Sequence, residues 1–329
     1  MSRYARQICL PEIGAAGQES LAAARVLIVG AGGLAASLLP ALVGAGVGAT
    51  TAGGRIELVD HDTVELGNLH RQTVFSTADI DQPKAVCAAR AMAALNPECH
   101  LMPQVARMDP VLARAMITRG AFDLVLDAAD SFALTYSLSD ICAATGTPLI
   151  SASVLARAGM VGGFCGGAPS YRAVFPDLPP RMQTCAEAGV MGPAVMMMGA
   201  LQAQMALSVL LGHQPSPLGQ MMSVDLAAWR VSTFRFDGAE EETAQRPQIV
   251  GISEITREDT VIELRGMIEA PVPAVAQALR ILPDALDGFT PQGAGRIVLA
   301  CASGLRAWHG ARRLAQRWPN PVAIVAVGG

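Results

Sequence analysis

The chain has 329 residues, of which 51% are hydrophobic, and its formal net charge is -4. This length accommodates about two domains with a large core, and the slightly acidic balance, with no run of like charges, excludes an electrostatic nucleic-acid surface and a polybasic membrane patch. Residues 1–7 lack the apolar stretch and the cleavage site of a secretory signal. We therefore expect a cytoplasmic protein whose partners are proteins and nucleotides.

Seven cysteines are spread widely along the chain. An odd number of distant cysteines in a large chain without an export signal is not typical of a disulfide framework, so we expect reduced thiols. The sequence contains no Cys-x-x-Cys pair, and its five histidines are scattered. It therefore predicts no structural zinc site, and we expect no metal other than a magnesium ion bound with a nucleotide.

Residues 25–150 alternate short β-rich runs with longer alanine-rich stretches. This alternation predicts an α/β fold with a doubly wound, mostly parallel sheet and helices on both faces. The expected strands are 26–29, 56–59, 100–105, 124–126 and 148–151, and the expected helices are 33–45, 83–95, 110–119 and 131–145. Later strands at 159–164, 171–174, 221–225 and 229–236 are expected to extend the sheet with an antiparallel portion.

Residues 189–212 are almost continuously apolar and long enough to cross a bilayer. Hydropathy alone does not distinguish a membrane helix from a buried one. The segment contains Pro193, Gln202 and Gln204 among many alanines and methionines. This composition favours a helix in a core or a dimer interface, and we expect no membrane span.

The composition becomes acidic and polar over residues 237–254, which is typical of a linker. We expect a first domain over 1–240, a linker over 241–254 and a small α/β domain over 255–329. In the small domain we expect strands at 261–264, 297–300 and 322–327 and helices at 272–279 and 305–317.

A glycine-rich loop, Gly30-Ala31-Gly32-Gly33, follows the first expected strand and precedes a helix. Glycines let the backbone approach a phosphate closely, and the free N–H groups of the helix start attract the anion. Asp60 ends the next strand, where an acid can accept hydrogen bonds from ribose hydroxyls. These two features are equally typical of an NAD-dependent oxidoreductase, so they leave the reaction open.

Three further charged residues favour a triphosphate and the activation of a carboxylate. Arg71 and Lys84 add positive charge, and at about 4 Å and an effective dielectric of about 20 each could supply roughly 4 kcal/mol of attraction. Asp130 follows the strand at 124–126, at the sheet edge where ligands bind, and could hold magnesium. Taken singly, the two cations could be solvated surface groups and Asp130 a helix cap; together they favour adenylation.

Several motifs occur in a fixed order between residues 3 and 236. They are Arg3-Tyr4-Ala5-Arg6-Gln7, Gly17-Gln18, residues 26–34, Ala45-Gly46-Val47-Gly48, Asp60-His61-Asp62, Asn68-Leu69-His70-Arg71-Gln72, Gln82-Pro83-Lys84 and residues 184–191. With these motifs the chain resembles the ubiquitin-activating-enzyme superfamily, and within it the bacterial sulfur-carrier adenylyltransferases (MoeB/ThiF/HesA type) of the molybdopterin and thiamine pathways.

The resemblance implies a Rossmann-like domain that binds ATP with Mg²⁺ and adenylates the C-terminal Gly-Gly carboxylate of a ubiquitin-like sulfur carrier. It also implies a homodimer, in which Arg6 reaches the phosphates of the partner protomer. The implied nucleotide pocket comprises Gly30, Gly32, Gly33, Asp60, Asp62, Gly67, Asn68, Leu69, His70, Arg71, Gln72, Lys84, Asp130 and Ser131.

Three positions depart from the family pattern. Ser131 stands where asparagine is usual, and Ala35 replaces a glycine at the helix start. Residues 170–173 stand where the family has a zinc-binding Cys-x-x-Cys pair, and the second such pair is also missing. We therefore expect a zinc-free branch in which apolar packing stabilises that region.

Two thiols are candidates for sulfur chemistry. Cys185 precedes the long apolar helix, where a helix start can lower a thiol pKa, and the family's reactive cysteine occupies this motif. Cys301 lies in a strand-loop-helix segment whose backbone N–H groups can surround the sulfur. This segment resembles the active loop of rhodanese-like domains, where the cysteine carries a persulfide, although the domain is short. An external donor such as a cysteine desulfurase is the alternative sulfur source, and each thiol could instead be a buried or vestigial group.

Two rival functions remain at this point. An NAD-dependent oxidoreductase would explain the glycine loop and Asp60 but not Arg71 or Lys84. A catalytically inactive scaffold that binds a carrier protein would fit the missing zinc ligands, Ser131 and the short second domain.

Overall fold

The N-terminal domain is built on an eight-stranded sheet with strand order β3-β2-β1-β4-β5-β6-β7-β8. The computed structural model describes residues 3–178, 189–241, 246–291 and 295–328. The strands are β1 (Arg25–Val29), β2 (Arg55–Val59), β3 (Leu101–Gln104), β4 (Leu124–Asp127), β5 (Pro148–Leu155), β6 (Ala158–Cys165), β7 (Gln220–Asp225) and β8 (Arg230–Arg235). Neighbours from β3 to β5 pair in parallel, whereas β5 to β8 pair antiparallel. The predicted doubly wound sheet with an antiparallel extension is confirmed.

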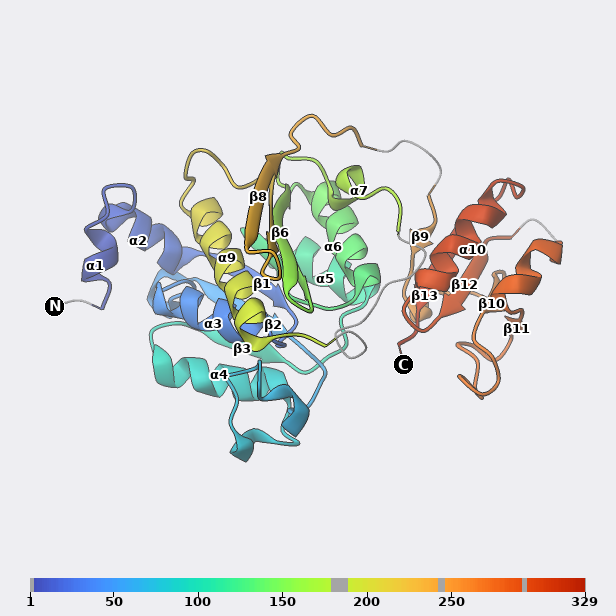
Figure 1. Cartoon of the computed structure of the whole chain (residues 1–329), viewed down its shortest axis with the longest axis horizontal. Coiled ribbons are helices and arrows are strands. Elements are labelled where there is room, and N and C mark those ends of the chain that lie inside the picture. Colours follow the sequence, from blue (N-terminus) through green and yellow to red (C-terminus); the bar gives the residue numbers. More distant parts are fainter. Residues whose placement is uncertain (1–2, 179–188, 242–245, 292–294, 329) are drawn as a thin grey trace.

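Helices cover both faces of this sheet (Figure 1). They are α1 (Ala5–Ile8), α2 (Gly14–Ala23), α3 (Ala35–Gly44), α4 (Lys84–Leu95), α5 (Pro110–Gly120), α6 (Phe132–Thr145), α7 (Tyr171–Val174) and α9 (Gly192–Leu210). Short 3-10 turns are η1 (Thr50–Ala52), η2 (Leu66–Asn68), η3 (Thr77–Asp79), η4 (Ile252–Glu254) and η5 (Pro283–Gly288).

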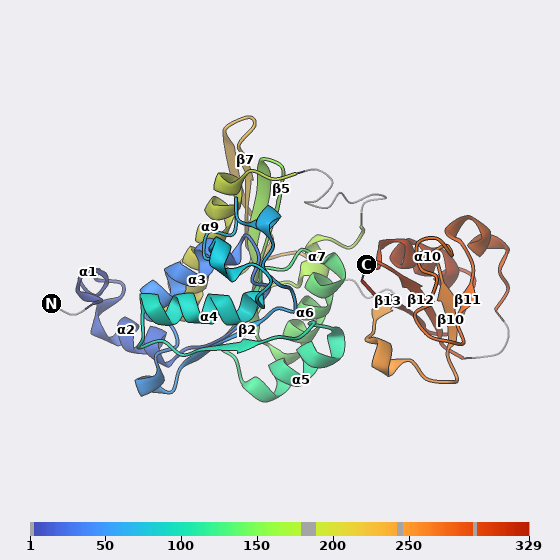
Figure 2. The same ribbon diagram turned by 90° about the horizontal axis from the view of Figure 1, so that it is seen from below.

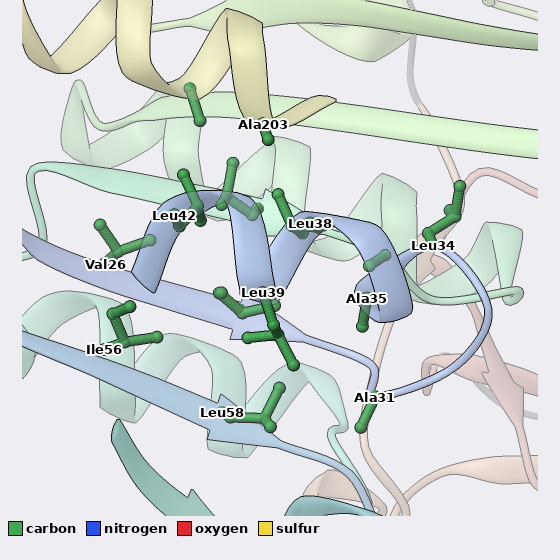
Figure 3. Close-up of a cluster of buried hydrophobic side chains, with 14 of the residues drawn as sticks. Val26, Ala31, Leu34, Ala35, Leu38, Leu39, Leu42, Ile56, Leu58 and Ala203 are labelled. Atoms are coloured by element: carbon green, nitrogen blue, oxygen red, sulfur yellow. The ribbon is translucent and has the colours of Figure 1, made fainter. Parts of the chain in front are cut away.

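The strand β1 shows why both faces need a cover. Successive side chains of a strand point to opposite faces, and all of Val26 to Val29 are apolar. Val26 and Ile28 pack with α3, α4 and α9, while Leu27 and Val29 pack with α5 and α6. Figure 3 shows Leu38, Leu39 and Leu42 of α3 between the strands and α9. This packing fixes the glycine loop, which joins β1 to α3.

By length and composition, α9 is the one helix among the described residues that could cross a membrane. In the structure it packs against α3, β5 and β6. Val195, Met198 and Ala206 are buried in the main core. The apolar sequence of α9 is therefore used in core packing, as expected for this segment.

A second, all-parallel sheet forms the C-terminal domain, with strand order β11-β10-β12-β13-β9. Its elements are β9 (Gln248–Ile249), β10 (Thr260–Glu263), β11 (Leu279–Arg280), β12 (Ile297–Cys301), α10 (Leu305–Ala315) and β13 (Val322–Ala326). Part of the segment expected to be a linker, Gln248–Ile249, thus pairs with β13. Residues before 255 therefore contribute to this sheet.

Two expected elements are wrong. Residues 171–174 form the helix α7 instead of a strand, because the Ser170 side chain accepts a hydrogen bond from Ala173 N (3.2 Å) and caps the turn. Residues 272–278 form turns before β11 instead of a helix. Pro271 and Pro273 lack the backbone N–H groups that a helix needs, and Glu263 accepts the N–H of Ala274 (2.9 Å).

The two sheets meet at α6, and Figure 2 shows the C-terminal domain beside α6 and α7. Tyr136 of α6 and Trp308 of α10 pack with ring centroids 5.7 Å apart. The buried guanidinium of Arg172 lies over both rings, at 4.7 Å and 5.0 Å, and pairs with Asp140 (2.6 Å). This aromatic contact anchors one domain on the other.

Candidate functional site

The glycine loop turns sharply at the carboxyl end of β1. Gly30 has φ +100°, and its N–H donates to Val59 O (2.9 Å). A Cβ at Gly30 would lie 2.7 Å from Ala128 O, in the turn that follows β4. Only glycine fits this turn, so the loop lies directly against the segment that leads to Asp130.

Asp60 is linked to the glycine loop by hydrogen bonds. Its carboxylate accepts from Ala31 N (2.7 Å) and from Asp62 N (2.7 Å). Burial raises the pKa of Asp60 from its ordinary value of 3.8, although these two bonds and the nearby charge of Lys84 oppose the increase. Asp60 therefore holds the glycine loop directly, in addition to the ribose contact that is expected of it.

Lys84 is the most buried cation of the site. Its residue is 6% exposed, and Nζ donates to Asp62 Oδ2 (2.8 Å). Burial would raise the pKa of Asp62, but the hydrogen bond and charge of Lys84 outweigh it and lower the pKa. Lys84, Asp62, Asp60 and Ala31 thus form a continuous series from the cation to the loop.

Arg71 and Gln72 approach the same loop from η2 and the turn after it. A Cβ at Gly33 would lie 3.6 Å from Arg71 Cδ, and one at Gly32 would lie 3.9 Å from Gln72 Nε2. Arg71 Nη1 donates to Gly67 O (3.2 Å), and Arg71 forms no ion pair with the described residues. Gln72 is 3% exposed, and its Oε1 has no hydrogen-bond partner among the described residues. A buried amide oxygen without a partner is available to a ligand donor.

Other residues of η2 and of the turn after it make local contacts. His70 Nδ1 lies 3.1 Å from Gly67 O, and Asn68 Nδ2 donates to Glu65 at 3.5 Å. Leu69 packs partly against the main core. These residues position Arg71 and Gln72.

Asp130 and Ser131 lie between β4 and α6. Asp130 is exposed, and Ser131 occupies the N-cap position of α6 without a side-chain cap bond. A second set of candidate ligands lies beside Lys84: the carboxylate oxygens of Asp60 and Asp62 and a ring nitrogen of His61 are within 4.8 Å of one another. Because Lys84 and two backbone N–H groups already occupy this set, Asp130 is the freer carboxylate.

Asp127 was not expected among the site residues, yet it organises the turn that carries Asp130. It is fully buried and accepts hydrogen bonds from Thr135 Oγ1 (2.6 Å), Ser151 Oγ (2.8 Å) and Ala129 N (3.2 Å). Burial raises its pKa from 3.8 to about 6, although these bonds oppose the increase. An acid that ends an otherwise apolar strand is the signal that could have found it.

Three of the expected site residues are not part of this cluster as the structure describes it. Arg6 is exposed on α1, whose Gln7 donates to Ala45 O (3.0 Å) at the far end of α3 from the glycine loop. Its expected role across a dimer therefore stays a prediction. Cys185 lies outside the described residues. Cys301 ends β12 in the C-terminal domain and is fully buried.

Replacing Gly33 with alanine is expected to destabilise the N-terminal domain by about 1–3 kcal/mol, because overpacking at a tight contact costs this much. The new Cβ would lie 2.6 Å from Val195 Cγ1 of α9. Gly32→Ala is the matched control, since the nearest atom there is 3.9 Å away. Urea unfolding of both variants measures the difference, and equal stabilities would contradict this account of the loop.

Together, the open α/β sheet, the glycine loop and the charged groups at its carboxyl edge define a nucleotide-binding doubly wound protein. The chain belongs to the ThiF family, whose family model matches residues 4–245. It is 40% identical over 213 residues to the adenylyltransferase and sulfurtransferase UBA4 of Yarrowia lipolytica, covering 64% of this chain and 52% of that protein. It is also 38% identical over 245 residues to a sulfur carrier protein adenylyltransferase of Thermus thermophilus, covering 71% of this chain and 88% of the relative.

The fold is also similar to that of E. coli MccB, crystallised with MccA-N7isoASN. The TM-score is 0.64 at 20% sequence identity, and the match covers 74% of each chain. At this identity the likeness concerns the fold alone. The chain spans about half the length of the UBA4 relative, and all of these matches leave a part of this chain uncovered.

Proposed function

We propose that the N-terminal domain binds ATP and adenylates the C-terminal Gly-Gly carboxylate of a ubiquitin-like sulfur carrier. The carboxylate oxygen attacks the α-phosphorus, pyrophosphate leaves, and the carrier becomes an acyl-adenylate. The observation that carries this proposal is the hydrogen-bonded series from Lys84 through Asp62 and Asp60 to Ala31 of the glycine loop. Membership of the ThiF family and the Thermus thermophilus relative support the same activity.

The charged groups have separate roles in this reaction. Lys84 and Arg71 offset the negative charge of the triphosphate as the carboxylate approaches. When nucleotide binds, Lys84 can share its ammonium group between Asp62 and a phosphate, because it has three donors. The buried Gln72 Oε1 is available to accept a hydrogen bond from a nucleotide hydroxyl or amino group.

Magnesium fits the oxygen donors of this edge. Asp130 would hold the ion, because it is exposed and lies in the turn that Asp127 fixes beside the glycine loop. The ion would supply positive charge to the phosphates. A homodimer in which Arg6 reaches the partner's phosphates completes the proposal, and gel filtration with Arg6→Ala activity measurements tests it.

The activated carrier would then receive sulfur as a thiocarboxylate. Cys301 or an external cysteine desulfurase would supply the sulfur, with Cys185 assisting the release of the intermediate. The outer sulfur of the donor persulfide attacks the carrier carbonyl, AMP leaves, and the carrier is held to the donor cysteine by an S–S bond. Attack of the Cys185 thiolate on the donor cysteine's sulfur then breaks that bond, releases the carrier thiocarboxylate and leaves a disulfide, which a thiol reductant reopens.

Pyrophosphate exchange tests the adenylation step directly. Incubation with ATP, labelled pyrophosphate and a carrier ending in Gly-Gly is expected to give labelled ATP only when the carrier is present. NAD binding in place of ATP would favour an oxidoreductase. ATP binding without exchange for any Gly-Gly carrier would favour an inactive scaffold.

We further propose that the region around α7 is held without zinc. Where the family resemblance places metal-binding cysteines, Ser170 N and Oγ donate to the two carboxylate oxygens of Glu241, each at 2.7 Å. Chelator treatment is therefore expected to leave the Tm unchanged. Glu241→Ala is expected to lower stability by about 1 kcal/mol, whereas the neighbouring Glu240→Ala leaves it unchanged. Stoichiometric zinc, or a Tm that falls with chelator, would disprove this proposal.

A further inference from the structure

The sulfur of Cys301 lies in a site that stabilises an anion. It accepts hydrogen bonds from Gly304 N (3.1 Å) and Ala307 N (3.4 Å). Arg265 and Arg306 lie near this sulfur, and each is already paired with a carboxylate, Arg265 with Glu263 and Arg306 with Glu269. Backbone N–H groups that converge on a sulfur in this way suit the nucleophilic chemistry proposed for Cys301.

The same sulfur has no access to solvent. Cys301 is 0% exposed although it ends a strand and begins a loop. The other domain lies against this loop: a Cβ at Gly304 would lie 3.3 Å from Ala133 Cβ and 3.4 Å from Phe132 Cζ of α6, and 3.4 Å from Ala326 Cβ of its own domain. Cys301 belongs to the same buried cluster as Ala133 and Tyr136. The start of α6 is thus a lid on the Cys301 loop.

Among the described residues, this lid is held by the buried contact of Tyr136 with Trp308 and by ion pairs at the surface. Arg312 of α10 pairs with Asp177, which lies in the segment after α7. Arg114 of α5 pairs with Glu254 (2.8 Å). Exposed pairs of this kind contribute little each, so the contact of Arg172 with Tyr136 and Trp308 is the main one that opening must break. A contact held this way can open without unfolding either sheet.

The chemistry that the loop favours requires this contact to open. A thiolate accepts sulfane sulfur by attacking the outer sulfur of a donor persulfide: a new S–S bond forms at Cys301, the donor's S–S bond breaks, and its electron pair stays on the donor thiol. The exchange has no net oxidation, but it needs room for the donor along the line of attack. With the α6 lid in place, a protein-borne donor has no path to the sulfur.

We propose that the contact between α6 and the Cys301 loop is a gate, which shields the thiol when closed and admits a persulfide donor only when the two domains separate there. The inference rests on the proposed sulfur-transfer function, but the gate itself can be measured without ATP, carrier or donor. The lid begins immediately after Asp130 and Ser131. The nucleotide site and the thiol gate therefore share the turn between β4 and α6.

Site-resolved alkylation of the full chain by iodoacetamide, followed by peptide mass spectrometry, tests the gate. In the wild type, Cys301 is expected to react at least about ten times more slowly than the exposed Cys9, despite its nearby cations. Arg312→Ala is expected to speed Cys301 labelling about threefold, and Arg114→Ala with Arg312→Ala more. Arg313→Ala is the matched control, since Arg313 lies next to Arg312 but pairs with Asp287 inside the C-terminal domain (3.3 Å).

The buried Cys142 of the N-terminal domain reports unfolding in the same experiment. Faster labelling of Cys301 alone supports the gate. The proposal fails if wild-type Cys301 reacts as fast as Cys9, or if the Arg312 variants match Arg313→Ala. It also fails if Cys301 and Cys142 accelerate equally, because the opening is then global. Loss of pyrophosphate exchange would contradict the proposed adenylation, but it would not change the labelling rates of the cysteines.

Discussion

Replacing Lys84 with alanine is expected to lower the kcat of carrier-dependent pyrophosphate exchange by about a hundredfold to a thousandfold, as is typical when one group that stabilises transition-state charge is removed. The side chain of Lys84 is only 8% exposed, and its ammonium nitrogen lies 2.8 Å from Asp62 Oδ2. Water therefore screens it poorly, and its charge acts at nearly full strength on a nearby phosphate. Initial rates of exchange at saturating ATP give this kcat directly.

Arg90→Ala is the matched control for Lys84→Ala. Arg90 lies on the same helix, α4, but pairs with Asp79, and its side chain is 64% exposed. Its removal is expected to change the exchange rate less than twofold or so. A Lys84→Ala enzyme with the Tm and the exchange rate of the wild type would show that Lys84 serves only to hold Asp62.

Replacing Asp127 with asparagine is expected to remove a pH dependence of folding stability worth about 3 kcal/mol. The pKa of Asp127 is about 6 in the folded protein against an ordinary value of 3.8, because the group is completely buried. The folded state thus binds the proton more tightly than the unfolded chain does. The contribution of Asp127 to stability is therefore largest below about pH 4 and is lost as the pH rises to about 6.

Asparagine has nearly the same shape and does not titrate. Its oxygen can accept from Ala129 N, and its amide can donate to the hydroxyls of Thr135 and Ser151, which replace Asp127's present contacts. Urea unfolding of both proteins from pH 4 to pH 7 isolates the group, since every other titration is common to the two. A stability difference that stays constant over this range would contradict the assignment.

The sequence predicts the layered fold well because the apolar runs are unambiguous. Residues 26–29 are all apolar and precede a glycine loop, a combination that suits a strand buried on both faces. The expected helix at 272–279 is wrong because Pro271 and Pro273 lack backbone N–H groups and Glu263 accepts the N–H of Ala274. The strand expected at 171–174 is wrong because a single hydrogen bond, from Ala173 N to the Ser170 hydroxyl, caps a four-residue helix there.

The site residues that belong to sequence motifs could be predicted, whereas the roles of residues placed by tertiary packing could not. Lys84, Asp60 and Arg71 each contact or adjoin the glycine loop, in keeping with the family pattern. Asp127 was not predicted as a site residue because it ends an apolar strand, where the sequence indicates core residues. The loop of Cys301 packs against α6, which lies more than 150 residues earlier in the chain. Local sequence around Cys301 therefore gives no sign of its cover.

The central claim is that this sheet edge joins a carrier carboxylate to AMP. It is tested most directly by isotope transfer, using a Gly-Gly carrier whose C-terminal carboxylate carries a heavy oxygen isotope, with ATP, Mg²⁺ and a thiol acceptor. The heavy oxygen is expected to appear in the released AMP, because that oxygen forms the bond to the α-phosphorus. Heavy oxygen in inorganic phosphate with release of ADP, or AMP that stays unlabelled while the carrier is consumed, would contradict it.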